Sequence, residues 1–186
     1  MTKTIKVTYL QTVIGELVLG ALGDDLCLLD YRYRKTRESV DLRLQLRLKA
    51  EFAERPSDVT AAAQRQVEEY LAGQRREFTI PYLTAGTAFQ QDVWEQIALV
   101  PYGQTISYLE LATRVGNPKA VRAAASATGA NALALLLPCH RIIGSGGSLG
   151  GYAGGLETKR HLLRLEGRGG AAEESPACTQ SAQPLF

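Results

Sequence analysis

The segment LLLPCHRII, residues 135–143, places a cysteine and a histidine side by side between two apolar runs. Cys139 and His140 together could carry nucleophilic chemistry, because a thiolate is a strong nucleophile. A free thiol has a pKa of about 8.5, so a base is needed to ionise it at neutral pH. The same pair also fits a purely structural role, in which a small buried cysteine lies beside a histidine that only makes a hydrogen bond.

The other cysteines form no metal-binding or disulfide pattern. Cys27, Cys139 and Cys178 are odd in number and widely spaced, with no CxxC pair, and the chain has only two histidines. This usage predicts neither a disulfide framework nor a cysteine-rich zinc site. We therefore expect no metal and no cofactor.

Composition limits the class of protein. The 186 residues, of which 45% are hydrophobic, are enough for one medium domain or two small domains. A net charge of +2 does not demonstrate a nucleic-acid partner, but it permits one if the basic residues cluster. No stretch approaches the roughly 20 apolar residues of a membrane span, and residues 1–5 are not followed by a signal-peptide core. We expect a soluble, cytoplasmic protein with no membrane contact.

The first 84 residues have the pattern of an α/β unit. Two hydrophobic segments, IKVTYLQTVIGELVLGAL and LCLLDYRYR, are typical of β-strands and are separated by a turn at residues 23–25. Leucine alternates with polar residues in DLRLQLRLK, residues 41–49. A period of two predicts a half-buried strand there, although leucine also suits helices.

A helix and a last strand complete this part of the chain. The segment SDVTAAAQRQVEEYLAG predicts a helix with Ser57 or Asp58 as its N-cap and Gly73 at its end. The segment EFTIPYL, residues 77–83, is predicted to be a closing strand.

Beyond Thr84 the pattern becomes mainly helical. Thr87 is a candidate N-cap for a helix whose apolar residues fall on one face, at Phe89, Val93, Ile97 and Val100. A short helix, a turn at residues 116–118 and another helix with Pro118 in its first turn follow. This outline is that of a helix-turn-helix, although two helices joined by such a turn more often simply pack a core.

The second helix of this pair is rich in small residues. A single Arg122 is surrounded by Ala120, Ala123, Ala124, Ala125, Ser126 and Ala127. Alanine favours helices and tight packing, which is one explanation. The other is that a DNA minor groove, only about 6 Å wide, admits a helix closely only if its side chains are small. The arginine could then fill the space left by an extruded base, which offsets part of the unstacking cost.

The motifs PCHRII, NPKAVRAAASATGAN, PYGQTISY and GYAGGLETKRHLLRLEG together resemble the O6-alkylguanine-DNA alkyltransferase family. The resemblance is dense from Phe89 to Gly167 and is at fold level only before that. It implies a small α/β N-terminal domain, residues 1–84, with a ribonuclease-H-like sheet and a supporting role. It also implies a mainly helical domain, residues 85–168, with a winged-helix-like helix-turn-helix. The small, polar residues that follow predict a flexible tail, residues 169–186.

The resemblance assigns catalytic roles to five residues. Cys139 is implied to be the alkyl acceptor, and His140 its base through a bridging water, with Glu166 orienting the imidazole. Tyr108 is implied to donate a proton to N3 of the leaving guanine. Asn131 matches an asparagine that links the recognition helix to the active-site strand.

The resemblance also implies where substrate and DNA bind. The backbone at Ile142 and the loop residues Tyr152, Ala153 and Gly154 are implied to form the walls of the guanine pocket. On the recognition helix, the candidate DNA-binding residues are Arg122, Ala123, Ala125 and Ser126, with Tyr108 beside them.

Three positions depart from the family pattern. Ala153 stands where many relatives have serine, so a side-chain hydrogen bond to the guanine oxygen would be lost. Ala132 replaces a frequent proline, and Gly129 stands where some relatives have a phosphate-binding arginine. These departures affect the expected affinity and not the reaction class.

The expected function is the repair of O6-alkylguanine in double-stranded DNA, bound at the minor groove by a monomer. The base is flipped out and its alkyl group moves irreversibly to Cys139. The thioether carbon of the product is far less electrophilic than an alkylated guanine, and nothing in the motif activates water to remove the group. Each molecule is therefore expected to act once.

Three alternatives belong to other classes. A non-catalytic lesion-binding relative would have another residue in place of Cys139. A cysteine hydrolase would need a deacylating water and an oxyanion hole, for which the motif gives no signature. A transcription factor would normally read the major groove with polar side chains, which AVRAAASATG lacks.

Two terminal features complete the expectations. Some relatives hold zinc in the N-terminal domain, but here only Cys27 is available and no histidine precedes His140. The tail ends in QPLF, which loosely resembles peptides that dock on bacterial sliding clamps, although a small, polar tail without a partner is the favoured interpretation.

Overall fold

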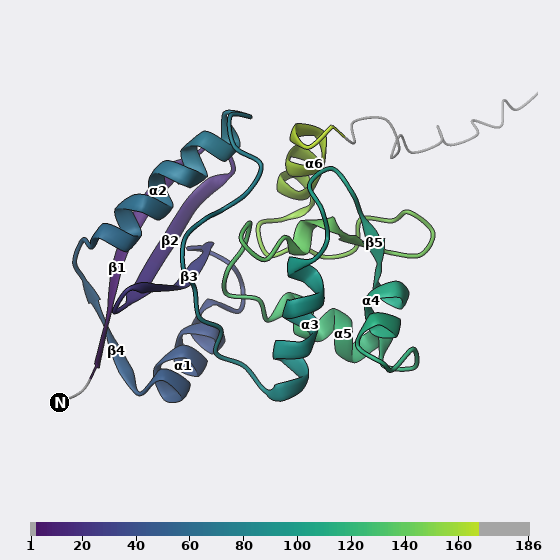
Figure 1. Ribbon diagram of the computed structural model, residues 1–186, viewed down its shortest axis with the longest axis horizontal. Helices are drawn as coiled ribbons and strands as arrows, with labels where there is room; N and C mark the ends of the chain where they lie inside the picture. The colour runs from purple at the N-terminus through teal and green to yellow at the C-terminus, as the bar shows by residue number, and fades with distance from the viewer. Residues whose placement is uncertain (1–2, 168–186) are drawn as a thin grey trace, which may run out of the picture.

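The computed structural model describes residues 3–167, which form an α/β part and a helical part (Figure 1). The proposed clamp peptide and Cys178 lie outside the described residues. The α/β part consists of β1 (Lys3–Thr12), β2 (Gly15–Leu22), β3 (Asp25–Tyr31), α1 (Arg37–Leu48), β4 (Ala50–Glu54) and α2 (Asp58–Leu71). The helical part consists of α3 (Ala88–Ala98), β5 (Ile106–Ser107), α4 (Tyr108–Arg114), α5 (Val121–Gly129), the 3₁₀ helix η1 (Cys139–Arg141), β6 (Ile142–Ile143) and α6 (Leu156–Leu165).

The sheet of the α/β part is mixed. Its strand order is β3-β2-β1-β4, in which β1 and β2 and then β2 and β3 pair antiparallel, whereas β1 and β4 pair parallel. The long apolar segment at residues 5–22 is divided between β1 and β2. The two strands form a hairpin in which Thr12 and Gly15 are the paired residues nearest the turn. The predicted turn at residues 23–25 is confirmed in position, with Gly23 at a φ of +62°.

The predicted strand at residues 41–49 is wrong, because this segment lies in helix α1. Val40 and Leu44, four residues apart, are buried, whereas Leu42 and Leu46 are 57% and 68% exposed. The alternating leucines therefore do not share an environment, and the helical spacing of Val40 and Leu44 decides the structure. Leucine is a strong helix former, which allows this outcome.

The predicted closing strand at residues 77–83 is also wrong. The segment makes only an isolated bridge between Leu26 and Tyr82. The Leu26 N–H donates to the Pro81 carbonyl at 2.9 Å, and the Leu83 N–H donates to the Leu26 carbonyl at 3.0 Å. Pro81 has no N–H, so it cannot extend the ladder into a strand.

The two predicted helix starts are confirmed. Ser57 caps α2 and Thr87 caps α3, and each side chain takes part in a capping box with the third helical residue. Gly73, at a φ of +73°, follows the end of α2. In α3 the predicted apolar face is buried at Val93 and Ile97.

The second helix of the predicted helix-turn-helix begins later than expected. Pro118 is not in its first turn, because α5 begins at Val121. Instead, the Ala120 N–H donates to the Asn117 carbonyl at 2.9 Å, so residues 117–120 form a turn with proline in the second position. Proline is favoured at this position because its φ is already set for the turn.

One hydrophobic core runs through both parts of the molecule. It includes Leu29 of β3, Tyr70 of α2 and Leu133 of the segment after α5. The Leu29 N–H donates to the Ala132 carbonyl at 2.8 Å, and the Ala134 N–H donates to the Leu29 carbonyl at 2.7 Å. The segment that leads to Cys139 is therefore attached to the edge of the sheet.

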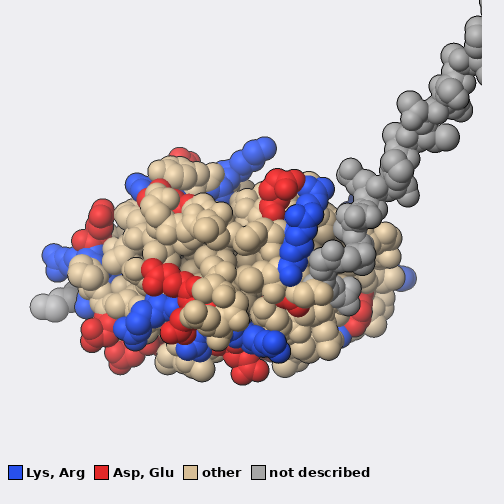
Figure 2. All heavy atoms as spheres, turned by 90° about the horizontal axis from the view of Figure 1, so that it is seen from above, with Lys and Arg blue, Asp and Glu red and all other residues tan. Residues whose placement is uncertain are grey.

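Charged side chains are mixed over the face shown in Figure 2, where Lys and Arg lie among Asp and Glu. This face therefore carries no broad patch of one sign. Among the helices of residues 3–167, none has the length and apolar character that crossing a membrane requires.

Candidate active site

Cys139 begins the short helix η1 and lines a cavity of about 1040 Å³. Its side chain is almost buried, and the residue is 6% exposed. The other predicted site residues that line the same cavity are Tyr108, Ala125, Ser126, Asn131, Tyr152, Ala153 and Gly154. The structure therefore brings together the residues assigned to the thiol, the guanine pocket and the recognition helix.

Asn131 fixes the loop that carries the cysteine. Its Nδ2 donates to the Leu137 carbonyl at 2.9 Å, and its Oδ1 accepts from the Leu133 N–H at 2.9 Å. Within this loop Leu135 has a φ of +72°, which a residue with a large side chain adopts only when its surroundings impose it. The Asn131 side chain thus holds together a loop that the backbone alone would not favour.

Burial raises the pKa of the Cys139 thiol above its ordinary value. The hydrogen bond to Asn131 and the charges of Lys159 and Arg34 act in the opposite direction, while the Asp30 carboxylate reinforces the rise. The net shift is upward, so the resting thiol is protonated at neutral pH. Nucleophilic chemistry at Cys139 therefore requires a base.

His140 has the properties of such a base. The side chain is fully buried, and its Nε2 lies 2.9 Å from Oε1 of Glu166. Burial lowers the pKa of the imidazole, although hydrogen bonding to Glu166 and its charge act to raise it. The buried Nδ1 makes no hydrogen bond to any residue that the structure describes. A neutral His140 that donates from Nε2 to Glu166 leaves Nδ1 as an acceptor.

Glu166 lies at the end of α6 and is surrounded by donors. Arg141 donates to it from Nη2 at 2.8 Å and from Nε at 2.9 Å, and the Gly103 N–H donates at 3.1 Å. The Tyr70 hydroxyl donates to Oε1 at 2.5 Å. Burial acts to raise the pKa of Glu166, but the hydrogen bonds from His140 and Arg141 outweigh it and hold the pKa well below its usual range. The carboxylate is therefore ionised.

Tyr108 is the first residue of α4 and faces the cavity. Burial raises the pKa of its phenol, and the negative charge of an ionised Cys139 raises it further. The phenol is therefore protonated and available as a donor. Gly150, at a φ of +65°, packs against it, since a Cβ at that position would lie 3.2 Å from the tyrosine ring.

The loop after β6 forms one wall of the cavity. A Cβ at Gly154 would lie 2.5 Å from the ring of Tyr31, so this close approach of loop and ring requires glycine. The Tyr31 and Tyr152 hydroxyls are hydrogen-bonded at 3.1 Å. Ile142, which was predicted to form part of this wall, is fully buried and does not line the cavity, and its carbonyl accepts a hydrogen bond from Lys159 Nζ at 2.6 Å.

Helix α5 presents one face to the solvent beside the cavity. Arg122, Ala123 and Ser126 are exposed, whereas Ala124 and Ala127 are buried against the core. Of the candidate DNA-binding residues, Arg122, Ala123 and Ser126 therefore lie on the outer face of α5, whereas Ala125 is half-buried and lines the cavity, and Tyr108 belongs to α4.

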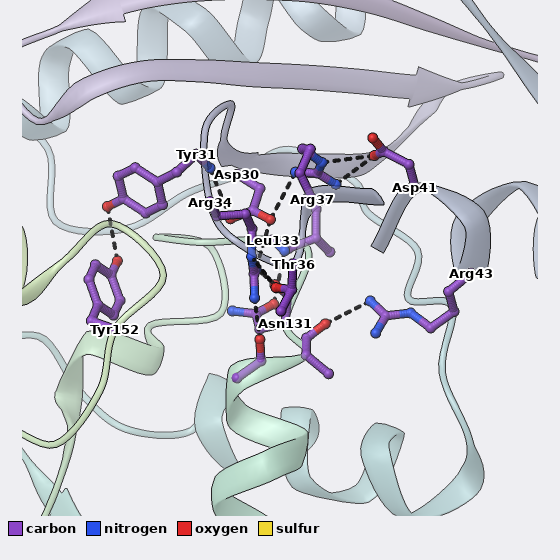
Figure 3. Close-up of polar contacts among 12 residues, drawn as sticks. Asp30, Tyr31, Arg34, Thr36, Arg37, Asp41, Arg43, Asn131, Leu133 and Tyr152 are labelled. Atoms are coloured by element: carbon purple, nitrogen blue, oxygen red, sulfur yellow. Dashed lines mark hydrogen bonds and ion pairs between the residues drawn. The ribbon is translucent and has the colours of Figure 1, made fainter. Parts of the chain in front are cut away.

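A polar network connects the C-terminal end of α5 to the α/β part (Figure 3). Arg34 Nη1 donates to Oδ2 of the buried Asp30 at 2.8 Å and to the Asn131 carbonyl at 3.0 Å, and Nη2 donates to the Gly129 carbonyl. Arg43 donates to the Ala130 carbonyl at 2.6 Å. These bonds satisfy carbonyls that a helix end leaves without partners.

Sequence reasoning missed several residues of this site. Arg141 follows the Cys-His pair directly and could have been found as a partner for Glu166. Lys159, whose burial lowers its pKa to about 8, lies within a quoted motif but was given no role. Tyr70 and Arg34 carry no local signal, because only the packing of the α/β part brings them to the site.

The fold and the site together define a cysteine-dependent DNA-modifying class of protein, in which a thiol backed by imidazole and carboxylate lies beside an exposed helix of small residues. Residues 88–168 match the family described as 6-O-methylguanine DNA methyltransferase, DNA binding domain.

The chain is 39% identical over 160 residues to the constitutive methylated-DNA–protein-cysteine methyltransferase of Bacillus subtilis, a match that covers 86% of this chain and 93% of that protein. It is 48% identical over 105 residues to the methyltransferase of Methanosarcina acetivorans, covering 56% and 67% of the two chains. The crystal structure of Mycobacterium tuberculosis OGT in complex with DNA is similar with a TM-score of 0.75 and 36% identity, covering 88% of this chain and 92% of that one. The chain therefore belongs to the O6-alkylguanine-DNA alkyltransferase family, the methylated-DNA–protein-cysteine methyltransferases, and the predicted resemblance is confirmed. It is a DNA-repair methyltransferase that acts by direct alkyl transfer.

Proposed function

We propose that this protein flips O6-alkylguanine out of double-stranded DNA and transfers the alkyl group to Sγ of its own Cys139. The observation that carries the proposal is the position of this thiol, which lines a cavity next to the outer face of α5 and is followed by the buried His140–Glu166 pair. In the transfer, a bond forms between Sγ and the alkyl carbon while the bond from that carbon to guanine O6 breaks.

The proton of the thiol moves to His140 through a water molecule. The Nε2–H of His140 is directed at Glu166, so Nδ1 is the nitrogen that accepts the proton. The ionised Glu166 stabilises the imidazolium that results, because the two groups are 2.9 Å apart and shielded from solvent.

The leaving guanine gains negative charge, which a proton donor must neutralise. Tyr108 donates a proton to N3 of the guanine, since its phenol is protonated and faces the cavity that contains Cys139. The walls formed by Tyr152, Ala153 and Gly154 hold the base. With alanine at position 153, any contact of that residue with the guanine oxygen comes from its backbone N–H.

The DNA approaches by its minor groove, over the outer face of α5. Ala123, Ala125 and Ser126 allow close approach, and Arg122 fills the space left by the flipped base. Gly129 gives no charge to this face. The nearest cation to its carbonyl is Arg34, which comes from the α/β part.

The finer features of the fold follow the same proposal. Residues 1–84 form a ribonuclease-H-like domain, supported by the β3-β2-β1-β4 order with one parallel pair, and residues 85–168 form the domain that binds DNA and carries the thiol. Helices α4 and α5, with the small β5-β6 sheet, form a winged-helix-like helix-turn-helix. The protein acts as a cytoplasmic monomer without a cofactor, and each molecule reacts once. A weak contact of the C-terminal tail with a sliding clamp belongs to the same proposal.

Replacement of the thiol tests the assignment. Cys139→Ser should abolish transfer from a duplex that contains O6-methylguanine while DNA binding stays close to that of the unchanged protein, because a serine hydroxyl remains protonated near neutral pH. Glu166→Gln should react more slowly, by about 10- to 100-fold, because it disorients His140 without removing the nucleophile. Continued demethylation by Cys139→Ser would exclude this cysteine as the acceptor. Transfer by Glu166→Gln at an unchanged rate would exclude the relay.

A further inference from the structure

Tyr70 lies near the C-terminal end of α2, in the α/β part, and reaches the residues that activate the thiol. Its side chain is fully buried, and its hydroxyl lies 2.5 Å from Glu166 Oε1 and 3.3 Å from His140 Nε2. We propose that Tyr70 is a positioning residue for alkyl transfer, which holds the Glu166 carboxylate in its orientation against His140 and shares its charge. This inference rests on the proposed function, and it gives the α/β part a role in reactivity beyond structural support.

The tyrosine hydroxyl has a single proton to donate. At 2.5 Å from an ionised carboxylate, that proton is directed to Glu166. The oxygen can then only accept from His140, so both neighbours of Nε2 are acceptors. Nε2 must carry the imidazole proton, which leaves Nδ1 free to take the proton of Cys139.

The ring of Tyr70 is held in place independently of its hydroxyl. It packs against Phe78 with ring centres 5.3 Å apart and against Tyr102 edge-to-face at 6.2 Å. Removal of the hydroxyl alone should therefore leave the ring where it is. This makes Tyr70→Phe a clean test of the hydrogen bond.

The charged surroundings set the direction of the expected change. Glu166 faces His140, Arg141 and Tyr70, and the imidazole is also influenced by the charges of Arg141 and Lys159. Without the Tyr70 hydroxyl, Glu166 still accepts hydrogen bonds from Arg141 and remains ionised, but it has lost one of the hydrogen-bond donors that stabilise its negative charge. Its attraction for a proton on His140 grows, so the pKa of His140 should rise. His140 should therefore become protonated, and unable to accept the thiol proton, at a higher pH than in the unchanged protein.

The test compares Tyr70→Phe with Tyr102→Phe. Tyr102 donates to the Leu165 carbonyl at 3.1 Å, so the control also loses one tyrosine hydrogen bond near the same helix end, a partly buried one that does not involve the carboxylate. Single-turnover transfer from free O6-benzylguanine, which needs no base flipping, is measured between about pH 5 and about pH 8. Tyr70→Phe should react about 10-fold more slowly on the plateau, and the acid limb of its profile should move to higher pH. Tyr102→Phe should match the unchanged protein in both respects.

A second measurement does not depend on the reaction. The ¹⁵N chemical shifts of the His140 ring, followed against pH, should show the imidazole taking up its second proton at a higher pH in Tyr70→Phe than in the unchanged protein, because Glu166 still accepts from Nε2 at 2.9 Å and attracts a proton more strongly. An unchanged acid limb and unchanged ring shifts in Tyr70→Phe would overturn the inference, even if the variant were less stable. If the unchanged protein fails to alkylate Cys139 at all, the proposed function fails, whereas normal transfer with an insensitive Tyr70→Phe defeats only the role of Tyr70.

Discussion

Arg34 should be the residue of the α/β part on which the position of α5 depends most strongly. Its guanidinium bonds the buried Asp30 and the carbonyls of Gly129 and Asn131 at once (Figure 3). Arg34→Ala removes all of these bonds and leaves the fully buried Asp30 carboxylate with Arg37 as its remaining arginine partner, at 2.9 Å. The variant should therefore lose stability through an undercompensated buried charge.

The magnitude follows from the contacts. Removing one partner of a buried ion pair costs about 3–5 kcal/mol, and the remaining arginine places this case at about 3 kcal/mol. For a chain of this length a change of that size lowers the melting temperature by about 6–12 °C. Urea unfolding followed by circular dichroism measures the free energy directly. A double-mutant cycle with Asp30→Asn isolates the pair, for which a coupling of about 2 kcal/mol is expected.

Arg37→Ala is the matched control. Arg37 also bonds Asp30, but its other partner is Asp41 and no bond of its side chain reaches α5. Because this side chain is partly exposed, its loss should cost only about 1 kcal/mol. The reasoning is refuted if Arg34→Ala unfolds within about 0.5 kcal/mol of the unchanged protein, or if the two variants lose equal stability.

Three further predictions concern the reaction. Burial lowers the pKa of His140, so single-turnover transfer should decline only below about pH 6.5 as the base becomes protonated, and a midpoint above that value would contradict its assignment. Arg122→Ala should slow repair of a duplex by about 10- to 100-fold, in line with the few kcal/mol that unstacking a base costs. Its reaction with a free modified guanine should stay unchanged. Equal losses of rate on both substrates would show that this arginine does not act in the duplex. Gly154→Ala must displace the ring of Tyr31 and should slow transfer even from the free base. Gly151→Ala, which has open space around its Cβ, should leave the transfer rate unchanged. Equal transfer rates for the two variants would show that the close approach at Gly154 is unimportant.

The parts of the fold that depend on local signals could be predicted from the sequence. The capping residues Ser57 and Thr87 identified two helix starts, because a capping box is encoded within four residues. The alternating leucines at residues 41–49 misled the prediction, since leucine suits both structures and only the burial of Val40 and Leu44 distinguishes them. Pro81 was a local signal against the closing strand that the hydrophobic pattern outweighed.

The site residues likewise fall into those that a local motif identifies and those that only the tertiary packing brings together. The Cys139–His140 pair is adjacent in the chain, whereas Glu166 lies 26 residues from His140 and was joined to it only through the family resemblance. Tyr70 and Arg34 reach the site from the α/β part, across separations of 96 and 97 residues to Glu166 and Asn131. No periodicity or motif encodes such contacts, because they arise from the way the sheet and its helices pack on the helical part.

Intact-mass analysis after incubation with a duplex that contains O6-methylguanine tests the central claim most directly. The account predicts that each protein molecule gains one methyl group, that peptide mapping finds it on Cys139, and that a second addition of substrate produces no further change. An unchanged mass together with tight binding of the duplex would contradict the account, because it would make the protein a reader of the lesion and not its acceptor.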